Sequence, residues 1–349
     1  MRNWGSWSVR QCIFVLIAAT GMQTIAAAES QDGRNNNIEM PIAYGDVNRQ
    51  DVQRFITEMV EEEGFDRAML ERVFAEAKYK QKIVDAISKP AERTLNWREY
   101  QDIFLTERRQ REGRRFMLEH KVTLARAYKQ YGVPAEIVAA IIGVETMYGS
   151  ITGGYRVIDS LSTLAFDYPP RGKFFRSELK HFLLLAREED QDPLVPKGSY
   201  AGAMGYGQFI SSSYRAYAVD FDGDGVRDIW HNPVDAIGSV ANYLSRHGWR
   251  KQEGITQQVE VGSPGPVLED LFNVDLKPSS EIRQLLPLGV KLTKEIAPET
   301  MVTPMRLLGK EGYEYWLGLQ NFYVITRYNH SELYAMAVFQ LSERLGAAG

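Results

Sequence analysis

The most apolar helical segment of the chain runs from residue 135 to residue 148 and reads AEIVAAIIGVETMY. Pro134 comes directly before it, and a proline fits the first turn of a helix. A helix that is apolar on nearly every side is stable only when other elements cover it. We therefore expect this segment to lie in the core of a domain, with the rest of the fold arranged around it.

One acidic residue, Glu145, interrupts this apolar pattern. Ile142, Ile141 and Val138 precede it by three, four and seven residues, and on a helix these positions share one face. Burial disfavours the charged form of a carboxyl group, and a carboxyl that stays protonated near neutral pH is what a general acid requires. The alternative is a glutamate in the last helical turn that reaches solvent near Gly149.

The rest of the chain is mostly helical in pattern. Apolar residues recur at spacings of three and four from about Asp51 to Tyr131, and again after Pro233. From Gln257 the texture changes to short aromatic or β-branched runs separated by glycine and proline, which predicts a small sheet. The last segment, ELYAMAVFQLSERL, is helical again. The sequence therefore predicts an α+β fold that is predominantly α.

The N-terminus has the features of a secretory signal peptide. Arg2 and Arg10 precede the apolar run CIFVLIAATGM. The segment TIAAAES after this run has the small residues of a cleavage site. We expect residues 1–28 to be this signal. A membrane anchor is the alternative, but the run is only about half of the roughly 20 apolar residues that a spanning helix needs.

Cysteine content and charge restrict the class of protein further. The only cysteine, Cys12, lies at the start of the apolar run and not at the cleavage point, which excludes a disulfide framework and argues against a lipid anchor. The formal net charge is −4, so the chain is not basic enough for a nucleic-acid partner. The basic stretch over 107–121 is interpreted as a solvated helix face. We expect a soluble exported protein.

An acidic segment, DFDGDGVRDIW, spans residues 220–230 and has the spacing of the first half of an EF-hand calcium loop. The ligands that it offers are three carboxylates and one backbone carbonyl, from Asp220, Asp222, Asp224 and Val226. Position twelve should be a glutamate but is His231, and Asp235 is the candidate that closes the loop. An acidic surface turn is the alternative. A structural calcium clamp is favoured over a switch, because sensors use paired EF-hands.

Two further segments have compositions that suit ligand binding. GSYAGAMGYGQF, residues 198–209, combines a serine and a glutamine with flexible backbone, and RYNHSELY, residues 327–334, places tyrosines beside an asparagine. Each is weak evidence alone, because glycine-rich loops are mostly turns and tyrosine clusters are mostly core. The sequence has five histidines and no HExxH motif, so no metal-hydrolase helix is evident.

Taken in order, IIGVETMYG, DYPPR, GSYAGAMGYGQF, VDFDGDG, NPVDAIGSVANYL and FYVITRYNHSELYAMAV resemble the lytic murein transglycosylase B family, which cleaves bacterial peptidoglycan. The resemblance covers about residues 45–345 and implies a lysozyme-like core, a helical N-terminal domain and a small inserted β domain. The implied division is a signal peptide over 1–28, a flexible lead over 29–45, a helical α domain over 46–131, the first part of the core over 132–250 with the EF-hand-like loop at 220–235, the β domain over 251–320, and the second part of the core over 321–349.

The same resemblance implies roles for individual residues. Glu145 corresponds to the single catalytic acid/base of the family. The glycan groove would be lined by Tyr100, Arg171, Ser199, Gln208, Tyr243, Tyr328, Asn329 and Tyr334. The family commonly has two adjacent arginines after its YP pair, whereas Pro170 precedes Arg171 in this chain. The chain resembles the soluble periplasmic members of the family, because it lacks the anchoring cysteine of the lipid-anchored ones. The family chemistry needs no cofactor, and calcium would have only a structural role.

The expected reaction cleaves the β-1,4 bond between N-acetylmuramic acid and N-acetylglucosamine without water and forms 1,6-anhydromuropeptides. Two alternatives stay open at this stage: a goose-type lysozyme that adds water, and a calcium-dependent glycan-binding protein without catalysis. The sequence does not indicate an endolytic or exolytic preference, a need for stem peptides, the oligomeric state, or which cell-wall synthases or hydrolases it joins.

Overall fold

The structure is a computed structural model that describes residues 43–88 and 95–347. The predicted signal peptide over 1–28 and most of the predicted lead over 29–45 lie outside these residues. Within the described ranges, no helix has the length and apolarity that crossing a membrane requires.

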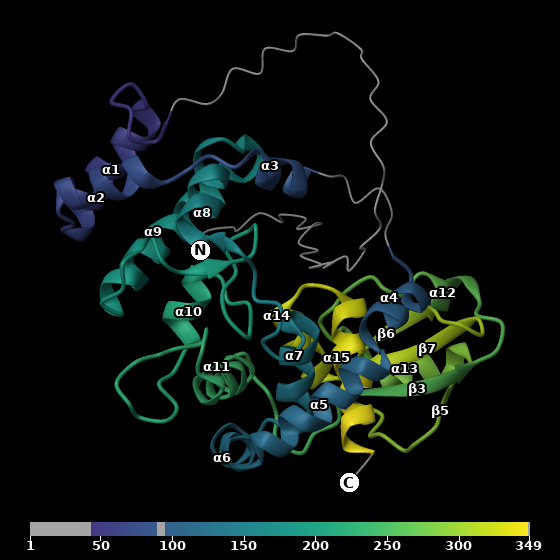
Figure 1. The fold of residues 1–349 in the computed structure, drawn as a ribbon. Helices are drawn as coiled ribbons and strands as arrows, with labels where there is room; N and C mark the ends of the chain where they lie inside the picture. The colour runs from purple at the N-terminus through teal and green to yellow at the C-terminus, as the bar shows by residue number, and fades with distance from the viewer. Residues whose placement is uncertain (1–42, 89–94, 348–349) are drawn as a thin grey trace, which may run out of the picture.

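Helices dominate the described chain, as the sequence predicts (Figure 1). The helices outside the sheet region are α1 (Gln50–Glu63), α2 (Arg67–Glu76), α3 (Gln81–Ser88), α4 (Trp97–Phe104), α5 (Glu107–Glu119), α6 (Lys121–Tyr131), α7 (Ala135–Thr146), α8 (Val157–Phe166), α9 (Gly172–Glu188), α10 (Ser211–Tyr217), α11 (Pro233–Arg246), α14 (Gln320–Tyr328) and α15 (Glu332–Gly346). A short 3-10 turn, Pro169–Arg171, connects α8 to α9.

The apolar helix α7 forms the centre of the core, which confirms the expectation from its composition. Every residue from 137 to 144 is buried. Helices α5, α6, α11 and α15 all contact it, and Figure 1 shows α15, which ends the described chain, running beside it. Segments about 190 residues apart in sequence therefore meet at this helix, and Glu145 lies where they meet.

The helices of the predicted α domain over 46–131 pack in two separate groups: α1 to α3 lie against α8, and α4 to α6 lie against α15 and α11. Helices α1 and α2 pack on α8 through Phe166, whose ring lies 5.9 Å from that of Phe55 and 6.1 Å from that of Phe74. Helix α3 also packs against α8. Helices α4 and α5 instead pack on α15, and α6 packs on α11. Periodicity identifies an apolar face but not the partner that covers it, so this division was not evident from the sequence.

The predicted sheet is present between α11 and α14. Its five strands are antiparallel in the order β4-β6-β7-β3-β5. Its elements are β3 (Thr256–Val261), α12 (Pro266–Glu269), β4 (Ser280–Glu281), α13 (Ile282–Leu285), the 3-10 turn Leu286–Leu288, β5 (Val290–Leu292), β6 (Met301–Leu308) and β7 (Tyr313–Gly318). The sheet has a small apolar core of its own that includes Leu268, Leu285 and Val302, so it is a distinct layer beside the helices.

A second, two-stranded sheet lies near α8. It pairs β1 (Tyr155–Arg156) with β2 (Lys197–Gly198) in antiparallel fashion. This pairing places the start of the glycine-rich segment, residues 198–209, beside the loop that follows α7. The turn after Glu145 and the glycine-rich segment therefore become neighbours.

Candidate active site

Glu145 occupies the next-to-last position of α7, and the turn after it has an unusual backbone. Met147, Tyr148 and Gly149 all have positive φ, at 49°, 57° and 86°. A side chain at Gly149 would collide with the Tyr206 ring, since an added Cβ would lie 2.2 Å from it. The helix therefore stops abruptly and the chain turns away, which leaves the Glu145 side chain at an open helix end.

Hydrogen bonds hold this helix end in place. The Thr146 hydroxyl donates to the Tyr206 carbonyl at 2.9 Å and accepts the Gly149 N–H at 3.0 Å. The Arg109 Nε donates to the Gly143 carbonyl at 3.0 Å. Arg109 is buried, although it belongs to the basic stretch that the sequence assigns to a solvated face. One arginine of that stretch thus supports the last turn of α7 from behind.

Within the described chain, the Glu145 carboxyl is buried and accepts one side-chain hydrogen bond. The Tyr334 hydroxyl donates to Glu145 Oε1 at 2.7 Å. Burial raises the pKa of Glu145 from 4.5 to about 7, and the hydrogen bond from Tyr334 partly offsets this rise. The carboxyl group is therefore close to half protonated at neutral pH, as an acid that also acts as a base requires.

A pocket of about 310 Å³ opens beside Glu145. Its lining includes seven of the nine predicted site residues, which are Glu145, Arg171, Ser199, Gln208, Tyr243, Tyr328 and Asn329. Among the described residues that line it, Glu145 is the only carboxylate. A glycosidase with two catalytic carboxylates would place both of them against the scissile bond. The pocket does not have that arrangement.

The glycine-rich segment contributes two ordered polar side chains to the pocket. The Ser199 hydroxyl accepts the Ala203 N–H at 3.0 Å. Gln208 has a positive φ of 49°, and its Nε2 donates to the carbonyls of Gly205 at 2.9 Å and Thr152 at 3.2 Å. Its Oε1 is buried and has no hydrogen-bond partner in the described chain. A buried acceptor without a partner can accept a hydrogen bond from a donor group of a ligand.

Three tyrosines follow one another from the pocket wall toward Glu145. The Tyr243 and Tyr328 rings meet edge to face at 4.8 Å, and the Tyr328 and Tyr334 rings are parallel within 7° at 6.5 Å. The Tyr243 and Tyr328 hydroxyls donate to the backbone carbonyls of Arg327 and Gly207, both at 2.6 Å. The Tyr243 and Tyr328 hydroxyls are therefore committed to the backbone, and the Tyr243 ring is also stacked on His247 at 4.0 Å.

Two predicted groove residues lie behind the pocket wall. Tyr334 and Tyr100 are 2% and 3% exposed, and neither lines the pocket. Burial raises the pKa of both hydroxyls, and the neighbouring Glu145 carboxylate raises them further. Both tyrosines therefore stay neutral. The structure places Tyr334 as a hydrogen-bond donor to Glu145 and Tyr100 as a packing neighbour, instead of as surface contacts.

The pocket lining also contains Phe174, Arg327 and His330, which no sequence motif singled out. The Arg171 guanidinium lies 4.4 Å from the centre of the Phe174 ring, and Phe174 also lines the pocket. Arg327 and His330 come from the end of α14 and the turn after it. Phe174 is a partly exposed aromatic residue three positions after Arg171, and that spacing on a helix was the available signal.

The acidic loop lies between α10 and α11, and its residues divide into two sets. Carboxylate oxygens of Asp220, Asp222 and Asp235 approach within 4.8 Å of one another. Asp224 does not belong to this cluster, and its Oδ1 accepts the N–H of Val226 at 2.8 Å. The structure thus brings the predicted closing residue, Asp235, to the loop.

Backbone N–H groups hold the loop carboxylates. Asp220 accepts the N–H of Gly223 at 2.6 Å and of Gly225 at 2.8 Å, and these bonds lower its pKa. Asp235 is fully buried at the start of α11 and accepts the N–H groups of Phe221 at 2.7 Å and Asp228 at 2.9 Å. Three oxygen donors of this kind fit a hard cation such as Ca²⁺.

A helical core, a separate antiparallel sheet and one buried carboxyl in a pocket together define a lysozyme-like enzyme. The model of the transglycosylase SLT domain matches residues 47–343. Membrane-bound lytic murein transglycosylase B of Escherichia coli (strain K12) is 43% identical over 311 residues, which cover 86% of this chain and 84% of that protein. The chain belongs to this family of lytic murein transglycosylases, and it is a lytic transglycosylase.

Solved structures agree with this family. The soluble lytic transglycosylase SltB1 from Pseudomonas aeruginosa is 50% identical with a TM-score of 0.82, covering 85% of this chain and 99% of that one. The Escherichia coli lytic transglycosylase SLT35 in complex with calcium is 43% identical with a TM-score of 0.78, covering 85% and 92%. The predicted family and α+β, lysozyme-like fold class are confirmed.

Proposed function

We propose that this enzyme cleaves the β-1,4 bond between N-acetylmuramic acid and N-acetylglucosamine in peptidoglycan, with Glu145 as its single acid and base. The observation that carries the proposal is that Glu145 is the only carboxylate among the described lining residues and has a pKa near 7. A reaction that uses one group first as an acid and then as a base needs such a pKa.

In the first step, protonated Glu145 donates its proton to the glycosidic oxygen, and the bond from that oxygen to the anomeric carbon breaks. In the second, the C6 hydroxyl of the same muramic acid attacks the anomeric carbon and gives its proton to the Glu145 carboxylate. The product is a 1,6-anhydro sugar, and the acid is restored. Because the substrate supplies its own nucleophile at high effective concentration, a second protein carboxylate is not needed.

Tyr334 keeps Glu145 in a conformation that suits both steps. Its hydroxyl bonds Oε1, which leaves the second oxygen, Oε2, to exchange the proton with the substrate. A charge-assisted bond to the carboxylate is stronger than a bond to the neutral acid. The Tyr334 hydroxyl therefore stabilises Glu145 in the interval after it has given up its proton.

The polar and aromatic lining of the pocket is proposed to bind the sugars. The partnerless Oε1 of Gln208 suits an acetamide N–H of the substrate. Tyr243 and Tyr328 line the pocket with aromatic carbon on which a sugar can pack, while Arg171, Ser199 and Asn329 supply further polar contacts. Tyr100 and Tyr334 support Glu145 from behind instead of touching sugar.

Digestion of purified peptidoglycan sacculi, followed by mass spectrometry of the released fragments, tests the proposed reaction. Anhydro products are lighter by one water than the products of a lysozyme. Fragments with the hydrolysed mass would contradict the proposal and would favour the goose-type lysozyme alternative.

We also propose that the acidic loop binds Ca²⁺ as a structural clamp, with Asp220, Asp222 and Asp235 as its carboxylate ligands. Supporting this are the cluster of carboxylate oxygens and the calcium complex of the 43% identical SLT35. Asp224 and the Val226 carbonyl remain ligand candidates from the sequence pattern. Bound calcium would stabilise the fold and would take no part in bond cleavage.

The relatives are murein-degrading enzymes, and we propose that this chain acts in the periplasm on peptidoglycan glycan strands. The sequence pattern of residues 1–28 supports export. Fractionation of cells that produce the full chain checks the location, with the mature N-terminus determined by peptide sequencing.

A further inference from the structure

A cavity of about 650 Å³ lies where the linker between α2 and α3 meets α8 and strand β1. Its lining includes Lys78, Lys80, Lys82 and Arg156, and Asp159 is the single acidic residue among the described residues that line it. We call it the lysine cavity. It shares no lining residue with the catalytic pocket, and the chemistry proposed for that pocket gives it no role.

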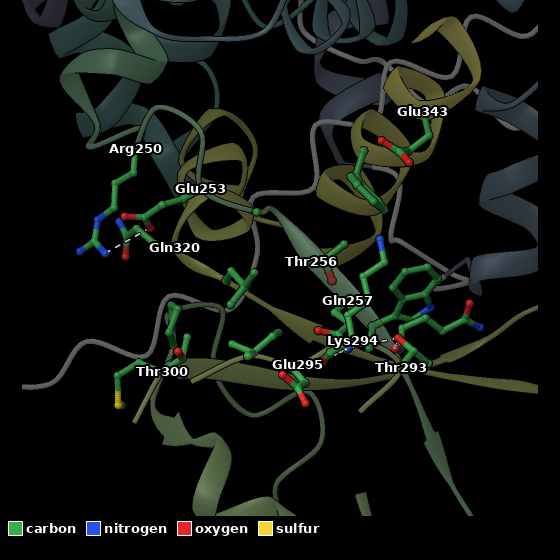
Figure 2. Close-up of a pocket in the computed structure, with 18 of the residues that line it drawn as sticks. Arg250, Glu253, Thr256, Gln257, Thr293, Lys294, Glu295, Thr300, Gln320 and Glu343 are labelled. Atoms are coloured by element: carbon green, nitrogen blue, oxygen red, sulfur yellow. Dashed lines mark hydrogen bonds and ion pairs between the residues drawn. The ribbon is translucent and has the colours of Figure 1, made fainter. Parts of the chain in front are cut away.

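The sign of its charge distinguishes the lysine cavity from a cavity of about 1200 Å³ beside the larger sheet. Charges of both signs line the cavity at the sheet, where Figure 2 shows Lys294 and Glu295, with Glu343 from α15 above them. In the lysine cavity four cationic side chains meet one carboxylate, although the formal net charge of the whole chain is −4. An excess of positive charge in one concave part of an acidic protein favours an anionic ligand.

The one carboxylate of the lysine cavity is already paired within the protein. Asp159 is buried and accepts Arg156 Nη2 at 2.7 Å and Arg156 Nε at 3.0 Å. The lysine ammonium groups, in contrast, have no ion pair in the part of the chain that the structure describes, where the ion-paired lysines are Lys180 and Lys310. Three ammonium groups are therefore available to a ligand.

Hydrogen bonds from the backbone hold the lysines together. The Lys78 N–H donates to Asp159 Oδ1 at 2.9 Å, and the Lys80 N–H donates to Thr163 Oγ1 at 3.2 Å. Asp159 and Thr163 are one turn apart on α8, so the linker follows this helix, with α3 packed beside it (Figure 1). The backbone positions of the lysines are therefore set before a ligand binds, which lowers the entropy that binding costs.

Three ammonium groups suit a phosphate better than a carboxylate. A phosphate monoester has close to two negative charges at neutral pH and three strong acceptor oxygens, whereas a carboxylate has one charge on two oxygens. Lysine binds phosphate as a point charge. A flat lipid surface would contact the exposed Lys78 and Lys82, but Lys80 is half-buried, and so are Tyr79 and Tyr155 in the same lining. A compact group that enters the cavity reaches all three lysines.

The lysine cavity and the catalytic pocket border the same pair of strands. Tyr155 lines the lysine cavity and belongs to β1, which pairs with β2. Ser199, directly after β2, lines the catalytic pocket. A Cβ added at Gly153 would lie 2.1 Å from the Gly198 carbonyl oxygen, so the two segments are in close contact. Because paired strands lie only about 4.8 Å apart, one extended ligand can contact both sites.

We propose that the lysine cavity binds a phosphate or diphosphate group carried by the glycan strand whose sugars occupy the catalytic pocket. A strand has such a group while it is still attached to the lipid diphosphate on which it is polymerised. The reaction that supplies this substrate is therefore glycosyl transfer from a lipid diphosphate, and the enzyme acts preferentially on newly made strands. The proposal rests on the proposed function, because it takes peptidoglycan strands as the substrate.

Titration with inorganic phosphate, followed by phosphorus NMR in buffer without calcium, tests the site. We expect the native chain to bind phosphate, and we expect Lys78→Gln and Lys80→Gln each to weaken binding about fivefold, since each removes one ammonium contact and keeps the backbone N–H. Lys129→Gln is the matched control, because Lys129 is an exposed lysine of α6 outside the lining, and it should change affinity less than about twofold.

Absence of phosphate binding by the native chain, or equal affinity of the native chain and both cavity variants, would overturn the proposal. Inorganic phosphate has no glycosidic bond, so these results do not depend on whether Glu145 cleaves one. Failure of this titration and failure of the proposed reaction are therefore separate outcomes.

The source of the phosphate is tested with two matched samples of glycan strands. Strands polymerised from a lipid-linked precursor keep their diphosphate, and mild acid removes it from the second sample. We expect the native chain to have a KM about fivefold lower for the diphosphate strands, with kcat unchanged, and Lys80→Gln to remove this difference.

Two other outcomes would contradict a strand-borne phosphate. If inorganic phosphate binds but both strand samples have the same KM, the cavity takes free phosphate only. If the lysines instead support binding to vesicles of phosphatidylglycerol while KM is the same for both samples, the cavity faces a membrane. Either result would overturn the proposal.

Discussion

The end of α7 and the acidic loop before α11 both concentrate carboxyl chemistry, but the protein treats the two in opposite ways. In the described chain, Glu145 receives a single hydroxyl bond, and burial raises its pKa to about 7. Asp220 receives backbone N–H groups from its own loop, which lower its pKa. One carboxyl is prepared to exchange a proton, and the other is held ionised.

The contrast shows that burial and hydrogen-bond donors act on a carboxyl in opposite directions: burial sets the raised pKa of Glu145, and backbone N–H groups set the lowered pKa of Asp220. Backbone N–H groups favour the charged form and so prepare a cation ligand. A buried carboxyl that accepts one hydroxyl bond, as Glu145 does in the described chain, keeps its neutral form accessible. Asp235 is intermediate, since burial raises its pKa while N–H bonds from Phe221 and Asp228 oppose the rise.

The largest expected effect comes from removing the proton that Glu145 exchanges. Glu145→Gln should lower cleavage of sacculi at least about 10³-fold, because an amide cannot act as general acid or base. Turbidity loss of sacculi measures the rate, and circular dichroism should report an unchanged fold. Cleavage within tenfold of the native rate would show that Glu145 is not the catalytic acid and base. Glu136→Gln, in the first turn of the same helix, is the control.

The same substitution should stabilise the protein at neutral pH and above. The folded-state pKa of Glu145 lies above its ordinary value of 4.5, so its contribution to stability is intact below pH 4.5 and is lost as pH rises through about 7. The loss is at most roughly 3 kcal/mol. Chemical denaturation measures the free energy of unfolding of both proteins at pH 5 and pH 8. The difference between the Gln variant and the native chain should be more in favour of the variant at pH 8 than at pH 5. An equal difference at both pH values would contradict the raised pKa.

Much of this contrast could be anticipated from the sequence. The spacing of apolar residues before Glu145 placed it on an apolar helix face, with a glutamate that reaches solvent as the alternative. Asp235 was the candidate to close a loop whose twelfth position has no acid. Both predictions depend on residue spacing within one short segment, and a single sequence is enough to show that spacing. The change of texture at Gln257 likewise matched the start of β3.

The supporting contacts could not be anticipated, because they join distant segments. Arg109 belongs to a stretch with mostly charged neighbours, and nothing local indicates that it reaches the Gly143 carbonyl. Tyr334 is recognisable as part of an aromatic cluster, but its position behind the pocket wall follows from how α15 packs on α7. The ring of Phe174 is likewise placed by the turn between α8 and α9.

Calcium should affect stability at the acidic loop without changing the chemistry at Glu145. A cation at 100 times its Kd adds about 2.7 kcal/mol, which should raise the Tm of the chelator-treated protein by several degrees. Asp235→Asn should abolish this calcium response, whereas Asp270→Asn, an exposed aspartate near the sheet, should keep it. Differential scanning calorimetry with and without Ca²⁺ measures both. A native Tm that calcium leaves unchanged would contradict the clamp.

The smallest effect is expected from the hydroxyl that bonds Glu145. Tyr334→Phe removes a bond that lowers the pKa of the carboxyl, so the pKa should rise above about 7. Because one hydrogen bond contributes about 1 kcal/mol, the rise should be somewhat less than one pH unit. Protonated Glu145 starts the reaction, so kcat/KM falls as pH increases through this pKa, and in the variant that fall should move to higher pH.

Tyr243→Phe is the matched control, because the Tyr243 hydroxyl bonds the Arg327 carbonyl and not Glu145. It should leave the position of the fall unchanged. A fall that stays in place or moves to lower pH in Tyr334→Phe would mean that the tyrosine does not regulate the proton on Glu145. Tyr334 would then serve only to pack α15 against α7.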